Sequence, residues 1–476
     1  MRMLGRLALG GLLAATSTAL VTAGATRAPA TAAQGTPNVV LVLVDDGRVD
    51  DLAAMPRVRQ LIGAAGVSFT DFYAPFPLCC PARATLLTGQ YAHNHGVLGN
   101  TAPGGGFRKF RDQSTLATWL TPTYRTGLIG KYLNGYAPPY RPPGWDEWMV
   151  PSALYGYTGT RWYVHRGTGG GYQTISGYQT DTIAALASDF VARNAPQEEP
   201  FFLFTSIVAP HDGQPRDPDD VAGYPSPYVK PVYRDRFAGL TNTDPSFDEA
   251  DVSDKPIRPT RLSSTDIRGI TEHLQQRREA SLSIDDAVAR IMQALTDSGE
   301  LADTYVIFAS DNGLMLGEHR IRGGKSTPYE VANRIPFLVR GPGIPAGSEV
   351  HQVAGQIDFA ATVMAMAGLP APSSVDGASL LELLHDPGSA GPARRGVLLE
   401  ATANSDTETP PWHYRGVVDG NWKYVERATG RKELYDLVAD PFELTNLAGR
   451  AAYAQPQQEL AQLLFTLREC DGSQCR

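Results

Sequence analysis

The sequence predicts an α/β fold in which helices sandwich a large, mostly parallel sheet, followed by a smaller antiparallel subdomain. Two features indicate the sheet: continuous apolar runs typical of strands buried on both faces, and intervening segments whose apolar residues recur at helical spacing. A third feature indicates the subdomain, because the predicted strands become short and alternating from about residue 391. The chain's 476 residues, 42% hydrophobic and 19% charged, suit a large globular core.

The first predicted strand is Asn38–Val44, in which every residue after Asn38 is valine or leucine. Residues 200–208 read PFFLFTSIV and are predicted to form a second buried strand. The longest predicted helix covers about residues 264–298. The other predicted elements of the main sheet and its cover are helices over 55–65 and 181–194 and strands over 125–130, 304–309 and 335–339.

Two segments between these elements, 135–177 and 212–261, are rich in Gly, Tyr and Pro and are too long for simple connections. Long loops on an α/β sheet usually shape a binding cleft. We predict a main domain of residues 34–390 and a C-terminal antiparallel subdomain of residues 391–476. Within the subdomain, short strands are predicted over 396–401, 414–418 and 422–425, and a capping helix over 459–468.

Residues 1–33 are predicted to be an export signal (signal peptide). Arg2 and Arg6 precede an apolar run from Leu7 to about Ala25, and small residues follow at 30–33. A membrane anchor is the alternative, and it is disfavoured because Gly, Thr and Ser dilute the run and prolines and charges close it. We therefore expect a secreted protein without stable membrane insertion.

The chain carries 42 Lys and Arg residues against 50 Asp and Glu residues, which gives a net charge of −8. This balance predicts no basic face for nucleic acid, and we do not expect nucleic acid as a partner. An anionic substrate would need a local cationic pocket.

The four cysteines form two local pairs. Cys470 and Cys475 close a short loop, and in an oxidising compartment a disulfide is the simplest interpretation. Cys79 and Cys80 are adjacent, and adjacent cysteines rarely bridge each other without strain. At least one of them therefore needs another explanation.

Acidic residues follow two predicted strands. Asp45 and Asp46 end the first strand, and Asp311 and Asn312 follow the strand over 304–309. Because ligands bind at the carboxyl ends of strands in open α/β sheets, we expect the two clusters to meet. Carboxylate and amide oxygens are hard ligands that suit Ca²⁺ or Mg²⁺. Either cluster alone could be a polar turn, but together they favour a metal.

A helix is predicted to start at Cys79. Pro81 stands just inside an apolar segment that Gly89 ends, which places Cys79 at a helix N-terminus, where free amides favour an anion. The alternative is a buried structural cysteine. Two cysteines before Arg83 at a helix start favour a functional site.

The run Cys79-Cys80-Pro81-Ala82-Arg83, followed by Leu87-Thr88-Gly89, resembles the C-x-P-x-R signature of type I sulfatases, in which the first cysteine is oxidised to Cα-formylglycine. The resemblance spans nearly the whole chain after the predicted signal. Each further motif is weak alone, but their order is highly specific. They are Val44-Asp45-Asp46, Gly130-Lys131, Ala209-Pro210-His211, Ser310-Asp311-Asn312-Gly313, Gly324-Lys325 and Glu433-Leu434-Tyr435-Asp436-Leu437.

This resemblance implies a secreted sulfuric ester hydrolase with an alkaline-phosphatase-like fold, whose catalytic domain is residues 34–390. It implies that a formylglycine-generating enzyme converts Cys79 before export. It also implies that position 79 binds Ca²⁺, or less favourably Mg²⁺, together with Asp45, Asp46, Asp311 and Asn312.

The family's basic residues fall on Arg83, Lys131, His211 and Lys325. The resemblance implies that Arg83 holds the hydrated aldehyde. Lys131 and Lys325 would bind sulfate oxygens, and His211 would contact the substrate and protonate its leaving alkoxide. These cations would offset the charge of the transferring sulfuryl group.

Two positions depart from the commonest family pattern. Ala82 stands where many members have serine, a change that the C-x-P-x-R form tolerates. Leu133 stands where many arylsulfatases have a histidine, which leaves Asp311 as a candidate base for the hydrate. The runs 91–96 and 131–136 are closer to the N-acetylglucosamine-6-sulfatase branch, so a sulfated sugar is the preferred substrate class, ahead of an aryl sulfate.

Two other functions stay open: a phosphonate monoester or phosphodiester hydrolase of the same superfamily, and a catalytically dead sulfated-glycan-binding protein. His93 and His95 could contact a sugar or make local hydrogen bonds. Aromatic residues between 132 and 148 could stack on sugar rings or form a hydrophobic cluster beneath the loop, which is the safer interpretation. Glu318-His319 is either a rim contact or a solvated loop, and Asp358 is predicted to begin a helix.

Overall fold

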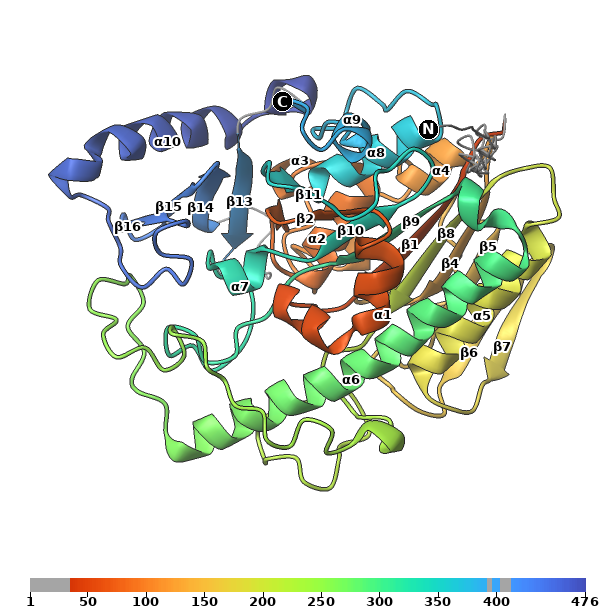
Figure 1. Ribbon diagram of the computed structural model, residues 1–476, viewed down its shortest axis with the longest axis horizontal. Coiled ribbons are helices and arrows are strands. Elements are labelled where there is room, and N and C mark those ends of the chain that lie inside the picture. Colours follow the sequence, from red (N-terminus) through yellow and green to blue (C-terminus); the bar gives the residue numbers. More distant parts are fainter. Residues whose placement is uncertain (1–34, 392–395, 403–411) are drawn as a thin grey trace, which may run out of the picture. The chain divides into compact units, whose positions relative to one another are not determined.

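A computed structural model describes residues 35–391, 396–402 and 412–476 (Figure 1). The predicted export signal over 1–33 lies outside the described residues. Within them, ten strands form one sheet in the order β11-β2-β10-β9-β1-β8-β4-β5-β6-β7. No helix of the described ranges has the length and apolar character that a membrane span requires.

The middle of this sheet is parallel, as predicted. β1 (Asn38–Val44) pairs in parallel with β8 (Phe201–Ile207) on one side and with β9 (Thr304–Ser310) on the other. β4 (Arg125–Gly130) continues the parallel pairing beyond β8. β10 (Phe337–Arg340) runs antiparallel to β9, so the sheet is mixed although mostly parallel at its centre.

Alternate residues of β1 face two separate cores, as the two-residue period of a strand requires. Its even-numbered residues pack with helices α5 (Gln179–Asn194) and α6 (Ser264–Asp297), which lie side by side on one face of the sheet (Figure 1). Its odd-numbered residues pack on the other face with α2 (Cys79–Thr88), α4 (Leu116–Leu120) and α8 (Ile357–Met366). Burial on both sides explains why the strand is uniformly apolar.

The segment over 135–177, expected to be a loop, adds three strands to one edge of the sheet. β5 (Glu147–Pro151) is parallel to β4, and β6 (Arg161–Arg166) and β7 (Gly169–Thr174) follow as antiparallel strands. β7 has the sequence GGGYQT and is exposed throughout, so no apolar pattern marks it. The segment over 212–261, by contrast, stays largely irregular, as expected.

The C-terminal region contains the predicted antiparallel sheet. It has four strands in the order β13 (Val397–Thr402), β14 (Trp412–Asp419), β15 (Trp422–Arg427) and β16 (Lys432–Asp436). Helix α10 (Ala454–Leu467) packs against this sheet and starts five residues earlier than expected. The division of the chain at residue 391 stays a prediction. Cys470 and Cys475 form the predicted disulfide.

The predicted helix over 55–65 is irregular. A 3-10 segment, η1 (Val49–Ala54), precedes α1 (Pro56–Val58), which continues into the π-helical η2 (Arg59–Gly63). The remaining short elements are β2 (Val67–Phe69), β3 (Phe72–Tyr73), α3 (Ala92–His95), η3 (Phe107–Lys109), η4 (Pro231–Tyr233), η5 (Glu300–Asp303), α7 (Glu330–Asn333), β11 (Ser348–Val350), β12 (Ala354–Gly355), α9 (Leu381–His385), η6 (Ala451–Tyr453) and η7 (Gly472–Cys475).

Gly130, the last residue of β4, provides a test of this packing. Its φ is 114°, and a Cβ there would lie 2.0 Å from the Ser206 carbonyl oxygen, which accepts the Lys131 amide. We expect Gly130→Ala to lower the free energy of unfolding by roughly 2–4 kcal/mol, because strain and overpacking add. Gly135→Ala is the matched control, since its φ is 77° and no described residue places an atom within 4 Å of the added Cβ, and it should lower that energy by only about 1 kcal/mol. Urea unfolding measures both, and equal losses would contradict the clash.

Candidate active site

The carboxyl ends of β1 and β9 bring the two predicted acidic clusters together. Val44 pairs with Ser310, so residues 45–46 and 311–312 leave the sheet side by side. The Asp46 amide donates a 3.0 Å hydrogen bond to Asp311 Oδ1, and Asn312 Nδ2 donates a 2.6 Å hydrogen bond to Asp46 Oδ1. All of these residues are buried, and Asp46 has a left-handed φ of 62°. The surrounding hydrogen bonds must hold that strained backbone in place.

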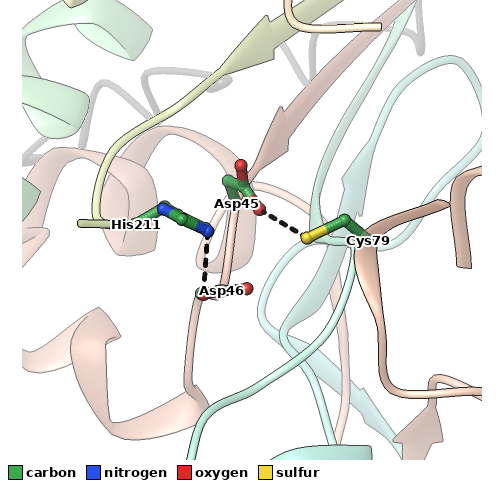
Figure 2. A group of neighbouring side chains, drawn as sticks. All are labelled: Asp45, Asp46, Cys79 and His211. Atoms are coloured by element: carbon green, nitrogen blue, oxygen red, sulfur yellow. Dashed lines mark hydrogen bonds and ion pairs between the residues drawn. The ribbon is translucent and has the colours of Figure 1, made fainter. Parts of the chain in front are cut away.

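Cys79 begins α2, as predicted, and faces this cluster (Figure 2). Its Sγ lies 3.5 Å from Asp45 Oδ1 and accepts a 3.0 Å hydrogen bond from Lys325 Nζ. The helix is buried along its whole length and ends at Gly89, whose φ is 65°. The first amides of a helix have no intrahelical partner and favour an anion. Position 79 is therefore fixed between a carboxylate, an ammonium group and a helix N-terminus.

Three predicted cations converge on the aspartates from separate parts of the chain. Lys131 follows β4, and its ammonium group bonds to Asp45. Lys325 bonds to Asp46. His211 follows β8, and its Nε2 lies 3.7 Å from Asp46 Oδ2. In Figure 2, Asp45 lies between His211 and Cys79.

Arg83, one turn further along α2, ties these elements together. Its Nε donates a 2.8 Å hydrogen bond to Asp311 Oδ2, and its Nη1 donates to the Lys131 carbonyl at 3.1 Å and to Ser206 Oγ at 2.7 Å. The side chain is 2% exposed. Its Nη2 is buried and has no hydrogen-bond partner within the described part of the chain. Arg83 thus links α2 to the ends of three strands and keeps one donor available.

The charges shift one another's pKa values. Burial raises the pKa of Asp45, but Lys131 and then His211 outweigh it and hold that pKa well below its usual range. Burial, reinforced by Asp45, raises the pKa of Asp311 to about 6. Burial lowers the pKa of His211, whereas Asp45 and Asp46 raise it, with a net value of about 9. Asp45 is therefore ionised and His211 protonated near neutral pH.

The residues present fit a divalent cation. Ligand atoms of Asp45, Asp46, Cys79 and His211 all lie within 4.8 Å of one another. Asn312 Oδ1 is buried and lacks a hydrogen-bond partner among the described residues. The oxygens of Asp45, Asp46 and Asn312 suit a hard cation. This group differs from the predicted ligand set by including His211.

This group also lacks Asp311, which was predicted to be a ligand. Its Oδ1 accepts from the Asp46 amide and its Oδ2 from Arg83, so both carboxylate oxygens have protein partners. If Asp311 acts as a base on the hydrate, the oxygens that would take the proton are therefore the same ones that already accept these hydrogen bonds. Leu133, which stands where many arylsulfatases have a histidine, is 2% exposed within the apolar core.

Sequence reasoning missed two residues that support the site. Arg277 of α6 donates from Nη2 to the Asp46 carbonyl and to Asp51 Oδ2, both at 2.6 Å. Its place on the apolar face of an amphipathic helix is a sequence pattern that could have identified Arg277. Tyr155 stacks on His211, and no pattern in its Gly- and Tyr-rich segment distinguishes it.

Other residues considered from the sequence have structural partners. His95 makes the local contacts that were the alternative to sugar binding, since its Nε2 lies 3.1 Å from Thr85 Oγ1 and its Nδ1 accepts the Val97 amide at 3.0 Å. His93 Nδ1 instead lies 3.0 Å from the carboxylate of Glu400, which is distant in the sequence. Asp358 lies in the first turn of α8 and accepts the Gly355 amide at 2.9 Å. The aromatic residues form the expected cluster beneath the loop, comprising Tyr132, Tyr136, Tyr140, Trp145 and Trp148 with Phe107.

Glu318 and His319 do not form a solvated loop. Both side chains are buried, because Glu318 pairs with Arg48 at 2.7 Å and His319 Nδ1 lies 2.6 Å from Glu249 Oε2. The two residues also line a cavity of about 230 Å³.

The mixed sheet, its two helical layers and the charged centre at its strand ends define a protein of the alkaline-phosphatase-like α/β class. Residues 37–369 match the family model described as Sulfatase, and residues 317–470 match the model described as N-sulphoglucosamine sulphohydrolase, C-terminal. The chain therefore belongs to the sulfatase family, a family of sulfuric ester hydrolases.

Curated relatives agree with this family. An extracellular sulfatase SULF-1 homolog of Drosophila melanogaster is 36% identical over 365 residues, which cover 73% of this chain and 31% of that protein. N-acetylglucosamine-6-sulfatase of Homo sapiens is 29% identical over 489 residues, which cover 92% of this chain and 86% of that protein. The chain spans only 31% and 49% of the fly and nematode extracellular sulfatases that it matches.

Solved structures share the fold. One, described as a complex with its substrate D-glucosamine-2-N,6-O-disulfate, has a TM-score of 0.75 at 23% identity and covers 90% of this chain and 97% of that one. The phosphonate monoester hydrolase of Agrobacterium radiobacter has a TM-score of 0.65 at 23% identity, over 91% of this chain and 95% of that one.

The buried pair of Arg83 with Asp311 generates a stability prediction. We expect Arg83→Met to lower the free energy of unfolding by about 3–5 kcal/mol, because it leaves a buried carboxylate without its partner. Arg125 pairs with Glu199 at 3.6 Å where the side chains are 48% and 58% exposed, so Arg125→Met should change that energy by less than about 1 kcal/mol. Urea unfolding followed by circular dichroism measures both variants. Equal stability of the two variants would contradict the structural role of Arg83.

Proposed function

We propose that this chain is an exported sulfatase that hydrolyses sulfate esters of a sulfated sugar, using a Cα-formylglycine derived from Cys79 and a Ca²⁺ ion. One observation carries the proposal. Cys79, in the family's signature motif at the start of α2, lies 3.5 Å from the Asp45 carboxylate and 3.0 Å from the Lys325 ammonium group, in a buried cluster. A nucleophile there would meet both a metal-binding group and cations for an anionic substrate.

Formylglycine, once formed, would supply a hydrated aldehyde whose two hydroxyls allow attack on sulfur and later release of sulfate. The chain's own residues have separate tasks. Lys131 and Lys325 flank position 79 and would neutralise the oxygens of the sulfuryl group. Arg83 Nη2, which has no hydrogen-bond partner among the described residues, would hold the hydrate. His211, protonated near neutral pH beside the aspartates, would donate a proton to the leaving oxygen.

Calcium is the proposed metal. Asp45, Asp46, Asp311, Asn312 and position 79 would hold it, and the ion would polarise the sulfuryl group and the nucleophile. The hard oxygen donors support Ca²⁺ or Mg²⁺, and Ca²⁺ is preferred because it accepts more protein oxygens and a less regular geometry.

A sulfated sugar is the proposed substrate class. The runs 91–96 and 131–136 resemble the N-acetylglucosamine-6-sulfatase branch. Relatives with that name, from Homo sapiens and other mammals, support the assignment over 89–92% of this chain. A bacterial relative from Bacteroides thetaiotaomicron is named N-acetylglucosamine-6-O-sulfatase.

Export is proposed from the signal-like composition of residues 1–33, with formylglycine formed before export by a generating enzyme. Support comes from the disulfide between Cys470 and Cys475 and from relatives named extracellular sulfatases. In this proposal residues 34–390 form the catalytic domain, and residues 391–476 form the antiparallel subdomain.

A second candidate function is phosphonate monoester or phosphodiester hydrolysis. The structural neighbour from Agrobacterium radiobacter favours it, since a cationic pocket also suits a phosphoryl group. Turnover of nitrophenyl sulfate against that of an aryl phosphodiester separates the two. A preference for the phosphodiester would replace the proposed activity, and binding of sulfated glycan without turnover of either would indicate a catalytically dead protein.

Adjacent cysteines allow a matched test of the nucleophile. We expect Cys79→Ala to lower sulfate ester turnover by at least about a thousandfold, the scale of loss when a nucleophile is removed. Cys80→Ala is the control, because Cys80 Sγ faces Asn134 at 3.1 Å rather than the carboxylates, and it should keep most activity. Turnover is measured with nitrophenyl sulfate, and thermal melting verifies folding. Mass spectrometry of the peptide containing position 79 should find an aldehyde there and an unmodified Cys80.

Metal dependence is tested by unfolding as well as by activity. We expect Ca²⁺ to raise the melting temperature of chelator-treated protein, since an ion at about 100 times its Kd stabilises the folded state by about 2.7 kcal/mol. Asp45→Asn should remove most of that shift, whereas Asp251→Asn, at an exposed position, should keep it. An unchanged melting temperature with Ca²⁺ would refute calcium as the structural ion, and a larger shift with Mg²⁺ would replace it.

A further inference from the structure

Tyr155 lies between β5 and β6 and contacts two residues of the proposed machinery at once. Its ring stacks on the His211 imidazole, with centroids 4.5 Å apart and planes 20° apart. The Lys131 ammonium nitrogen lies 4.9 Å from the ring centroid and 3.4 Å from Tyr155 Oη. Asn134 Nδ2 donates a 2.8 Å hydrogen bond to the same oxygen. The tyrosine is therefore held at both its ring face and its hydroxyl.

The backbone around Tyr155 also supports the loop that carries His211. Gln214 donates its amide to the Tyr155 carbonyl at 2.8 Å, and Tyr157 donates its amide to the Gln214 carbonyl at 2.7 Å. Tyr157 Oη donates a 2.6 Å hydrogen bond to the His211 carbonyl. These contacts fix the backbone of His211, so the remaining freedom of this residue is rotation of its side chain.

We propose that Tyr155 is a positioning residue, which fixes the plane of the His211 ring for sulfuryl transfer from a sugar. The inference rests on the proposed function. His211 Nδ1 lies 2.7 Å from the Asp212 carbonyl oxygen, and the stacked tyrosine ring blocks tilting about that contact. Together the two contacts keep Nε2 directed at the cluster, 3.7 Å from Asp46 Oδ2.

The alternative is a purely structural role, because Tyr155 also packs against the apolar core that α5 and α6 cover. The two roles differ in their dependence on the leaving group. A sugar alkoxide is a poor leaving group and needs a proton, whereas nitrophenolate leaves without one. Misplacing His211 should therefore slow the sugar sulfate selectively, while general loosening should slow both substrates alike.

The test compares Tyr155→Leu, Tyr155→Phe and the control Tyr172→Leu on N-acetylglucosamine 6-sulfate and nitrophenyl sulfate. Tyr172 is 43% exposed on β7. We expect Tyr155→Leu to lower kcat on the sugar sulfate by about 10–100-fold, and kcat on nitrophenyl sulfate by less than about threefold. Tyr155→Phe retains the stacked ring and should restore the wild-type ratio of the two kcat values. Tyr172→Leu should match the wild type.

A double-mutant cycle and a spectroscopic readout complete the experiment. Tyr155→Leu combined with His211→Ala should fall no further on the sugar sulfate than His211→Ala alone, because the two changes remove one effect. In ring-labelled protein, which has nine histidines, the His211 resonance assigned through His211→Ala should move in Tyr155→Leu and stay in place in Tyr172→Leu.

Equal losses of kcat on both substrates, an unchanged ratio or an unmoved His211 resonance would each overturn the inference. Thermal melting identifies a variant that fails to fold, and Tyr155→Met then replaces Tyr155→Leu. If the wild type hydrolyses neither sulfate ester, the proposed function fails, and the His211 resonance still decides whether Tyr155 stacks on that ring.

Discussion

Buried carboxylates at the ends of β1 and β9 are the constraint on which the rest of the site depends. Removing an ion from water costs several kcal/mol, so Asp45, Asp46 and Asp311 can stay ionised inside the protein only if cations and hydrogen bonds reach them. Four cationic residues from different parts of the chain pair with these carboxylates: Lys131, Lys325, His211 and Arg83. Because these cations gather around the carboxylates to stabilise them, the same centre is suited to both a divalent cation and an anion.

A second group of buried contacts keeps these charges in place. Arg83 reaches back from α2 to the end of β4, and Arg277 reaches from α6 to the Asp46 carbonyl. The strained φ of Asp46 is held between that contact and the hydrogen bond from its amide to Asp311. Buried contacts between residues far apart in the sequence therefore decide where these charged groups lie.

The C-terminal sheet supports the segment that carries Lys325. Tyr414 Oη of β14 donates a 2.9 Å hydrogen bond to the Thr327 carbonyl, two residues beyond that lysine. Lys423 of β15 is fully buried and pairs with Glu330 at 2.7 Å and with Glu443 at 2.9 Å. A buried lysine with two carboxylate partners ties α7 to the antiparallel sheet. The antiparallel sheet thus restrains the segment that carries Lys325.

The sequence by itself predicted the central parallel strands, the helix start at Cys79 and the two acidic strand ends, because these depend on local apolar patterns. Its resemblance to a family pointed to the four basic residues of the proposed site. It did not predict β5 to β7, because β7 has no apolar pattern and the apolar runs of β5 (WMV) and β6 (WYV) are short and lie within a Gly-, Tyr- and Pro-rich segment. Only the tertiary structure decided that His211 stands beside Asp46, that His93 is bound to Glu400 and that Tyr155 stacks on His211. The physical reason is that a side chain's partner across hundreds of residues is fixed by how layers pack, and neighbouring residues in the chain carry little information about that packing.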